Sequence, residues 1–143
     1  MTVKAILAAK GGDLISIEPT ATLDNAVKTL AKNRIGALLV LGPDRRVIGI
    51  LSERDIVRVL AEQGPDVLTQ PLSQVMTRKV VTVGPSETVA EIMERMTSGK
   101  FRHIPVVEQE QLIGIISIGD VVKHRLHQME QESAALREYI QTA

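Results

Sequence analysis

The chain contains no cysteine, and among its 143 residues there are one Phe, one Tyr and no Trp. The absence of cysteine excludes disulfides, thiolate metal sites and thiol nucleophiles. The scarcity of aromatic side chains leaves almost nothing on which the bases of single-stranded nucleic acid could stack. We therefore expect an aliphatic core, and we do not expect nucleic acid as a partner.

Net charge and long hydrophobic runs are also absent. Seventeen Lys and Arg residues balance seventeen Asp and Glu residues, so nothing marks the whole chain as a partner of nucleic acid or of an anionic membrane. The five consecutive apolar residues at 5–9 are too few for a signal peptide, and no run is long enough to span a membrane. We therefore expect a cytoplasmic protein without membrane contact, in which any bound anion is held by local groups.

An internal repeat is the clearest pattern that the sequence does contain. The segment GILSERD at 49–55 and the segment GIISIGD at 114–120 place Gly, Ser and Asp at the same spacing. The alignment extends toward the N-terminus, because the Pro-x-x-Thr at 19–22 falls on the Pro-x-x-Thr at 85–88 after a one-residue slip in the intervening turn. A repeat of about 65 residues predicts two structurally similar halves.

Each copy has the same predicted order of elements. A short strand at 15–17 or at 81–83 ends at Pro and is followed by a helix, which begins at Thr22 or at the capping box of Thr88 and Glu91. Two apolar runs joined by a turn then predict a pair of strands, and the Ser-x-x-Asp element begins a second helix. The unit is therefore β-α-β-β-α, and two units can pack with pseudo-twofold symmetry, which leaves two equivalent clefts between them.

The expected fold class is thus α/β (α+β), with the first repeat in residues 1–70 and the second in residues 71–143. The second repeat ends in an extended C-terminal helix. Along this helix a short coiled-coil-like seam, interrupted by one Ser, follows alternating steps of four and three: Val122, Leu126, Met129, Ser133, Leu136 and Ile140. Such a stripe usually packs on the core of its own chain, but beyond the repeat it could pair with a second copy of the protein.

In the order and content of these motifs the chain resembles a tandem pair of CBS domains, the Bateman module named after cystathionine beta-synthase, of the small bacterial stand-alone type. The segments that carry the resemblance are IGALLVLGPDRRVIGILSERDIVR, VMTRKVVTVGPSETVAEIMERM and FRHIPVVEQEQLIGIISIGDVVK. The resemblance implies binding of adenosine-containing ligands (AMP, ADP, ATP, NAD or S-adenosylmethionine) in the clefts between the repeats, and it does not imply catalysis. It also implies a homodimer, without choosing its geometry.

Two interpretations of the Ser-x-x-Asp elements stay open. The carboxylates of Asp55 and Asp120 could accept hydrogen bonds from both ribose hydroxyls, while the hydroxyls of Ser52 and Ser117, at helix N-termini, could donate to phosphate. The same residues would cap the two helices without any ligand, at a benefit of about 1 kcal/mol per cap. The resemblance favours the ligand role, because CBS pairs usually contact phosphate and ribose from these places.

Further candidates surround these motifs. Ile50 and Ile115, on the strands that lead into them, could flank the purine. The resemblance places the basic pair Arg102 and His103 beside the cleft that uses Asp55. Alternatively, Arg102 is a solvated surface cation and His103 a neutral histidine at the edge of a strand.

The two clefts are expected to be unequal. The place that corresponds to the basic pair in the first copy holds Gly36, which carries no charge and allows close approach of the backbone. Arg54 could supply charge to the cleft that uses Asp120. Pro105, in the strand that follows the basic pair, completes the candidate nucleotide site.

Catalysis and metal binding are not expected. His124 and His127 have a spacing that could share a metal ion, but the sequence offers no third ligand nearby. No arrangement of Ser, His and an acid stands out as a catalytic triad, so we assign no catalytic residues. We expect a regulatory, energy- or redox-sensing nucleotide-binding module that acts on a partner protein in trans. The alternative is a ligand-free dimeric scaffold, and a nucleotide-processing enzyme is a second rival.

Overall fold

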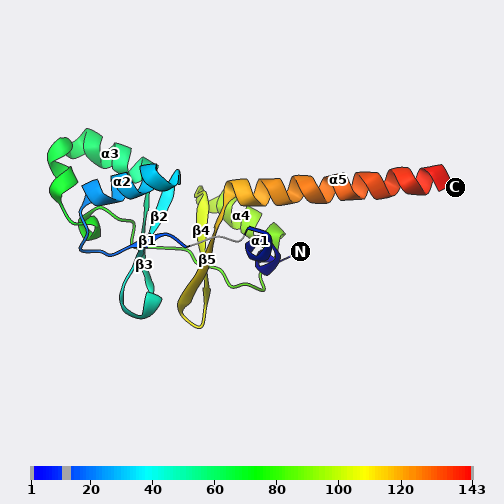
Figure 1. The fold of residues 1–143 in the computed structure, drawn as a ribbon, viewed down its shortest axis with the longest axis horizontal. Coiled ribbons are helices and arrows are strands. Elements are labelled where there is room, and N and C mark those ends of the chain that lie inside the picture. Colours follow the sequence, from blue (N-terminus) through cyan, green and yellow to red (C-terminus); the bar gives the residue numbers. More distant parts are fainter. Residues whose placement is uncertain (1, 11–13, 143) are drawn as a thin grey trace.

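The computed structural model describes residues 2–10 and 14–142, which form two halves side by side and a long helix that projects from the second half (Figure 1). The first half contains β1 (Ser16–Ile17), α2 (Leu23–Asn33), β2 (Ala37–Leu41), β3 (Val47–Ser52) and α3 (Glu53–Gln63). The second half contains α4 (Val89–Gly99), β4 (His103–Glu108), β5 (Gln111–Ser117) and α5 (Ile118–Thr142). The remaining elements are α1 (Val3–Lys10) and three short 3-10 helices, Pro43–Arg45, Pro65–Thr69 and Leu72–Gln74. The predicted α/β class, the two related repeats and the extended C-terminal helix are confirmed.

The first helix of each repeat begins at the predicted Thr. The hydroxyl of Thr22 accepts a hydrogen bond from the amide of Asn25, and the hydroxyl of Thr88 accepts one from the amide of Glu91, both at 3.2 Å. The buried residues of each helix recur three and four apart, as on one face of an amphipathic helix: Leu23, Ala26 and Leu30 in α2, and Val89, Ile92 and Met96 in α4. Met93, the neighbour of Ile92, is 39% exposed, because it lies beside the face that the other three residues form.

The strands of the two repeats are formed unequally. In the first, β1 pairs in parallel with β2, which pairs antiparallel with β3. In the second, β4 and β5 form the antiparallel pair, but the strand predicted at 81–83 is reduced to a single parallel bridge between Val83 and Val106. The reason is burial: Val83 is 3% exposed and Val81 is 45% exposed, so one residue of the segment is held against the sheet.

Each half has its own aliphatic core, and the segments that lead into the repeats are exchanged. Val3 and Ile6 of α1 are buried in the core of the second half, where the amide of Val3 donates to the carbonyl of Glu87 at 2.9 Å. Conversely, Leu72 and Met76 lie at the start of the second repeat in sequence but are buried in the core of the first half. Packing therefore crosses the division between residues 1–70 and residues 71–143, and it ties the two halves together.

The long helix α5 leaves the body soon after it begins. Among the described residues of α5, Val121 alone is buried. From Val122 onward the apolar seam is exposed. The interpretation that the seam packs on the core of its own chain is therefore wrong. None of the helices in the described ranges is long and apolar enough to cross a membrane.

Candidate functional site

Two clefts lie where the halves meet. The larger, here called the Asp55 cleft, has a volume of about 510 Å³, and the second, here called the Ser117 cleft, about 420 Å³. Each is lined by residues of both repeats, and Gly36 and His103 line both. Small-molecule sites in proteins usually have volumes of about 300–1,000 Å³, so each cleft is large enough for a nucleoside-sized ligand.

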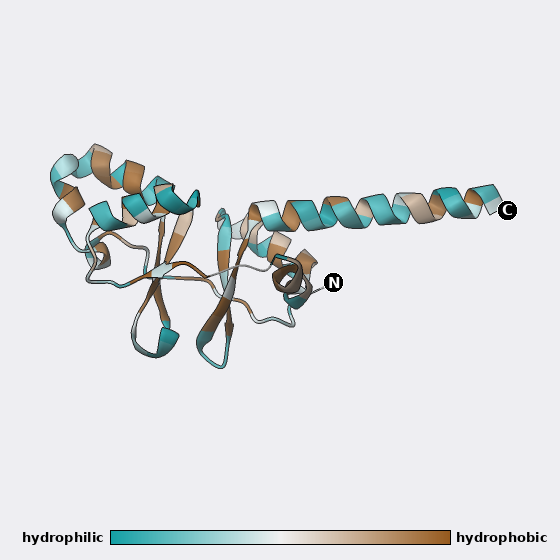
Figure 2. Ribbon diagram, viewed as in Figure 1, coloured by the Kyte–Doolittle hydropathy of each residue, from teal (hydrophilic) through white to brown (hydrophobic). Residues whose placement is uncertain are grey.

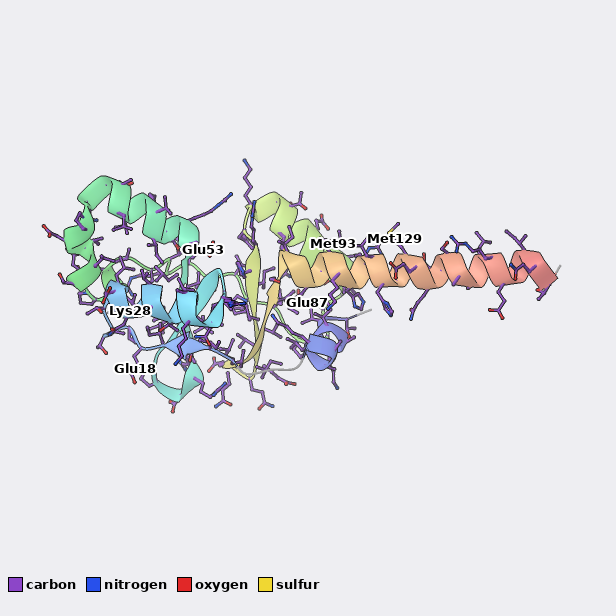
Figure 3. The ribbon with its side chains drawn as sticks, turned by 45° about the horizontal axis from the view of Figure 1, so that its top comes forward. Glu18, Lys28, Glu53, Glu87, Met93 and Met129 are labelled. Atoms are coloured by element: carbon purple, nitrogen blue, oxygen red, sulfur yellow. The ribbon has the colours of Figure 1, made fainter. Side chains whose placement is uncertain are left out.

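Most of the predicted site residues meet in the Asp55 cleft: Gly36, Ile50, Ser52, Arg54, Asp55, Arg102 and His103. The placement of Arg54 is a correction, because we expected it to serve the cleft that uses Asp120. Arg54 lies in the first turn of α3, and the N-terminus of this helix opens into the Asp55 cleft. Glu53, the first residue of α3, lines the same cleft (Figure 3).

The carboxylate of Asp55 is engaged within its own helix. One of its oxygens, Oδ2, accepts from the backbone amide of Ser52 at 3.0 Å and from the Ser52 hydroxyl at 3.1 Å, while the amide of Asp55 donates to that hydroxyl at 3.3 Å. Oδ1 accepts from the guanidinium of Arg58 at 3.0 Å. The capping interpretation is thus confirmed for this copy. It does not exclude the ligand role, because Asp55 lines the cleft and the Arg58 side chain bound to Oδ1 is 57% exposed and can move away.

The corresponding carboxylate in the second repeat is held by a residue from outside the repeat. Oδ2 of Asp120 accepts from the backbone amide of Ser117 at 2.9 Å and from the ammonium group of Lys10 at 2.8 Å. Lys10 also donates to the carbonyl of Ile115 at 3.0 Å. Burial alone would raise the pKa of Asp120, but the hydrogen bonds from Lys10 and Ser117 outweigh it and lower that pKa below its ordinary value.

Asp120 therefore does not face the cleft in which it was expected. Ser117 and Ile115 line the Ser117 cleft, whereas Asp120 lines a separate cavity of about 340 Å³ beside α5. Lys10 lines both cavities, because its ammonium group bridges the end of β5 and the first turn of α5. The acid of the second copy, in the first turn of α5, is therefore neutralised by Lys10 and lines the cavity between α1 and α5.

The basic pair lies at the start of β4. Arg102 lines the Asp55 cleft, as the resemblance implied, and its side chain is exposed. His103 pairs with Ser117 across the β4–β5 ladder, which places its ring between the two clefts. Burial, and next the charge of Lys10, lower the pKa of His103, so the imidazole is favoured in its neutral form.

The prediction that Pro105 belongs to the nucleotide site also needs correction. Pro105 is buried within β4 and is not among the residues that line either cleft. The physical reason is the bridge of the preceding segment: the amide of Val83 donates to the carbonyl of Pro105 at 3.1 Å, so this part of the strand is covered by the protein itself.

Several cations of the Asp55 cleft were missed by sequence reasoning. The lining contains five cationic side chains, Arg54, Arg58, Lys79, Lys100 and Arg102, and two carboxylates, Glu53 and Asp55. A signal existed, since Lys79 and Lys100 each stand just before the segment that enters the second sheet. The surplus of positive charge suits an anionic ligand. Among the described residues, no group of three or more His, Asp or Glu is arranged to hold a metal ion.

Comparison with known proteins identifies the family. The family model described as CBS domain matches residues 3–62 and again residues 72–127. Over 98% of its length the chain is 34% identical to the CBS domain-containing protein CBSX3, mitochondrial, of Arabidopsis thaliana, and it covers 72% of that protein. Three other Arabidopsis relatives are much longer, and the chain spans 23% of each. The chain belongs to the CBS-domain family, as a pair of CBS domains.

Solved structures agree with this assignment. A CBS-domain containing protein from Agrobacterium tumefaciens superposes with a TM-score of 0.84 at 45% identity, covering 87% of this chain and 99% of that one. A CBS domain protein from Pyrobaculum aerophilum complexed with AMP superposes with a TM-score of 0.75 at 29% identity, covering 84% of this chain and 89% of that one. The predicted family and fold are confirmed.

Proposed function

We propose that this CBS pair is a regulatory module that binds adenosine-containing ligands, AMP first among them, in the Asp55 cleft. The observation that carries the proposal is the convergence, in one cleft between the repeats, of the N-terminus of α3, the carboxylate of Asp55 and five cationic side chains. The AMP complex of the related Pyrobaculum protein supports the same ligand chemistry.

The cleft offers a partner for each part of AMP. Phosphate is attracted by the amides at the N-terminus of α3 and by Arg102, since helix N-termini carry positive potential. The ribose hydroxyls can donate to Asp55 once Arg58 has moved, and the side chain of Ile50 can contact the purine. The cap of Ser52 keeps α3 in place whether or not the ligand is bound.

The Ser117 cleft is a weaker second site in this proposal. A ribose there can reach Asp120 only if the ammonium group of Lys10 leaves both Asp120 and the carbonyl of Ile115. Binding must then offset the loss of these two interactions, so we expect the Asp55 cleft to fill first.

The wider role of the protein is part of the same proposal. ADP, ATP, NAD and S-adenosylmethionine share the adenosine part that the cleft would recognise, and we include them as candidate ligands. We infer that the protein is not an enzyme, that it acts in the cytoplasm as a homodimer, and that it regulates a partner protein in trans. The second candidate is a dimeric scaffold whose clefts stay empty. It is favoured by the caps of Ser52 and Ser117, because these hydrogen bonds hold the two helices from within the chain.

A thermal unfolding series separates the two candidates. A ligand that binds only the folded state, at one hundred times its dissociation constant, stabilises that state by about 2.7 kcal/mol. We expect this stabilisation with AMP, and its absence with AMP, ATP, NADH and S-adenosylmethionine alike would favour the scaffold. Mass spectrometry of small molecules carried through a mild purification would identify the ligand itself.

A further inference from the structure

The projecting part of α5 carries an apolar seam without a partner in the described chain. Brown residues recur among teal ones along this helix in Figure 2, and Met129 lies on the projecting part in Figure 3. The members of the seam follow alternating steps of four and three: Val122, Leu126, Met129, Ser133, Leu136 and Ile140. The five apolar members are each at least 48% exposed. Exposed apolar side chains at this spacing form the a and d positions of a coiled coil.

We propose that this seam pairs with the same seam of a second copy, as a parallel, in-register, two-stranded coiled coil. The a positions are Leu126, Ser133 and Ile140, and the d positions are Val122, Met129 and Leu136. The inference concerns how two copies meet, and it stands or falls independently of nucleotide binding in the clefts.

The charges beside the seam favour a second copy of the chain as the partner, and they favour a parallel direction of the two helices. The e positions are Lys123, Glu130 and Arg137, and the g positions are Arg125, Glu132 and Tyr139. In a parallel pair, each g residue faces the e residue of the following heptad in the other helix. Arg125 then faces Glu130 of the second copy, and Glu132 faces Arg137 of the second copy. Symmetry repeats both contacts, so all the charged g–e contacts of this arrangement join opposite charges.

An antiparallel pair fits less well. When the two helices overlap along their whole length, e faces e and g faces g, so Glu130 meets Glu130, Glu132 meets Glu132 and Lys123 meets Arg137. Each of these contacts joins like charges. A shift by one heptad removes the repulsion, but it places Leu136 opposite Gly119 and leaves Ile140 without a partner. The parallel register alone pairs every seam residue and also satisfies the charges.

These charges are also available for contacts between copies. Among the described residues, the recorded ion pairs do not involve Glu130, Glu132 or Arg137. Arg125 donates to the side-chain oxygen of its helical neighbour Gln128 at 3.1 Å, a neutral contact that an ion pair can replace. The flanking charges therefore have no competing ion pair within their own helix.

The absence of cysteine allows a direct test of direction in the full chain. In a parallel coiled coil, residue 140 of one copy lies beside residue 140 of the other, whereas in the antiparallel registers these residues are far apart. We expect Ile140→Cys, oxidised with diamide, to form a disulfide-linked dimer on a non-reducing gel. The matched control is Ala135→Cys, on the outer face of the same helix, which should stay unlinked. Equal linking of the two variants, or linking of neither, overturns the proposal.

A charge exchange tests the pairing itself, with sedimentation equilibrium as the measurement. Glu132→Arg alone and Arg137→Glu alone each place like charges in contact, and each should weaken self-association about tenfold. Mixing the two variants restores both opposite-charge contacts in a mixed dimer, which should form as tightly as the wild-type dimer. A monomeric wild-type protein at tens of micromolar, or single variants that dimerise as tightly as the wild type, would contradict the coiled coil.

Discussion

The two clefts are built on the same capping motif, yet they differ in what holds the acid. In the Asp55 cleft the third partner of the carboxylate is Arg58, one turn along the same helix. In the second copy the partner is Lys10, which comes from α1 at the other end of the chain. The repeat has therefore preserved the cap and not the electrostatic environment. A duplicated motif does not imply two equal sites.

The exchange of lead-in segments explains part of this difference. Because α1 packs on the second half, its last residue, Lys10, reaches the end of β5. The lead-in of the second repeat packs on the first half in the corresponding way, but it brings Thr77 and Lys79 to the Asp55 cleft, and neither bonds to Asp55. The acid of the Asp55 cleft is covered by an exposed surface arginine, and this makes the Asp55 cleft the better candidate for a ligand.

The largest effect is expected from the matched glycines that contact the exchanged segments. A Cβ at Gly49 would overlap the thioether of Met76, and a Cβ at Gly114 would overlap the side chain of Leu7. Overpacking of this kind typically costs about 1–3 kcal/mol. We expect both Gly49→Ala and Gly114→Ala to destabilise the protein, the first more because Met76 is buried, as measured by urea unfolding.

The control for these variants is Gly84→Ala, because the nearest atom to a Cβ at Gly84 is 4.0 Å away. It should unfold close to the wild type. If Gly49→Ala and Gly114→Ala were as stable as this control, the lead-in segments would not be packed against the strands as the structure has them.

The second largest effect is expected on AMP affinity, when the acid of each cleft is replaced in turn. Asp55→Asn removes the charge and keeps an oxygen that can accept from the amide of Ser52, so the cap survives better than in an alanine variant. Because hydrogen bonds to charged groups contribute about 1.5–3 kcal/mol, we expect AMP affinity to fall by at least about tenfold in isothermal titration calorimetry. Asp120→Asn, the matched variant, should change the first binding event little. Equal effects of the two variants would show that the clefts are used alike.

The architecture could be predicted from the sequence because it depends on local patterns. The helices after Thr22 and Thr88 follow from a cap and a stripe of apolar residues three and four apart, and the repeat shows which elements correspond. The extended helix follows from a seam that continues beyond the second repeat. Each of these signals lies within one short stretch of chain.

The details of the site could be predicted only in part, because they depend on long-range packing. Arg54 was assigned to the wrong cleft, since the sequence does not say toward which cleft the N-terminus of α3 opens. Lys10 was missed, because nothing near it in sequence indicates that α1 crosses to the second half. Pro105 was included in the site, although a bridge from Val83 covers it.

A smaller effect is expected from Lys10→Met, which should make the second cleft more like the first. Lys10 helps to lower the pKa of Asp120 below 3.8, so the ionised acid stabilises the fold above this pH, and the stabilisation is lost as the pH falls through the lowered pKa. The variant should be less stable than the wild type by about 0–1 kcal/mol at pH 7, and the difference should shrink below pH 4 as the acid becomes protonated in both proteins.

Urea unfolding at pH 7 and at pH 3 measures this difference, and Lys4→Met, an exposed substitution on the same helix, is the control. Calorimetry with AMP should also show more complete filling of the second cleft in Lys10→Met. A stability difference that grows in acid would mean that Lys10 does not act through Asp120.

The smallest effect concerns His103, whose ring lies between the clefts and reports the charges of both. Its pKa is lowered first by burial, then by Lys10, and least by Arg102. We therefore expect Lys10→Met to raise the pKa of His103 more than Arg102→Gln does, in an NMR titration of the imidazole C–H resonances. Since the folded pKa lies below the ordinary value, the neutral ring stabilises the fold above that value, and this contribution is lost as the pH falls through the lowered pKa. A larger rise in Arg102→Gln would place His103 electrostatically in the Asp55 cleft rather than between the two.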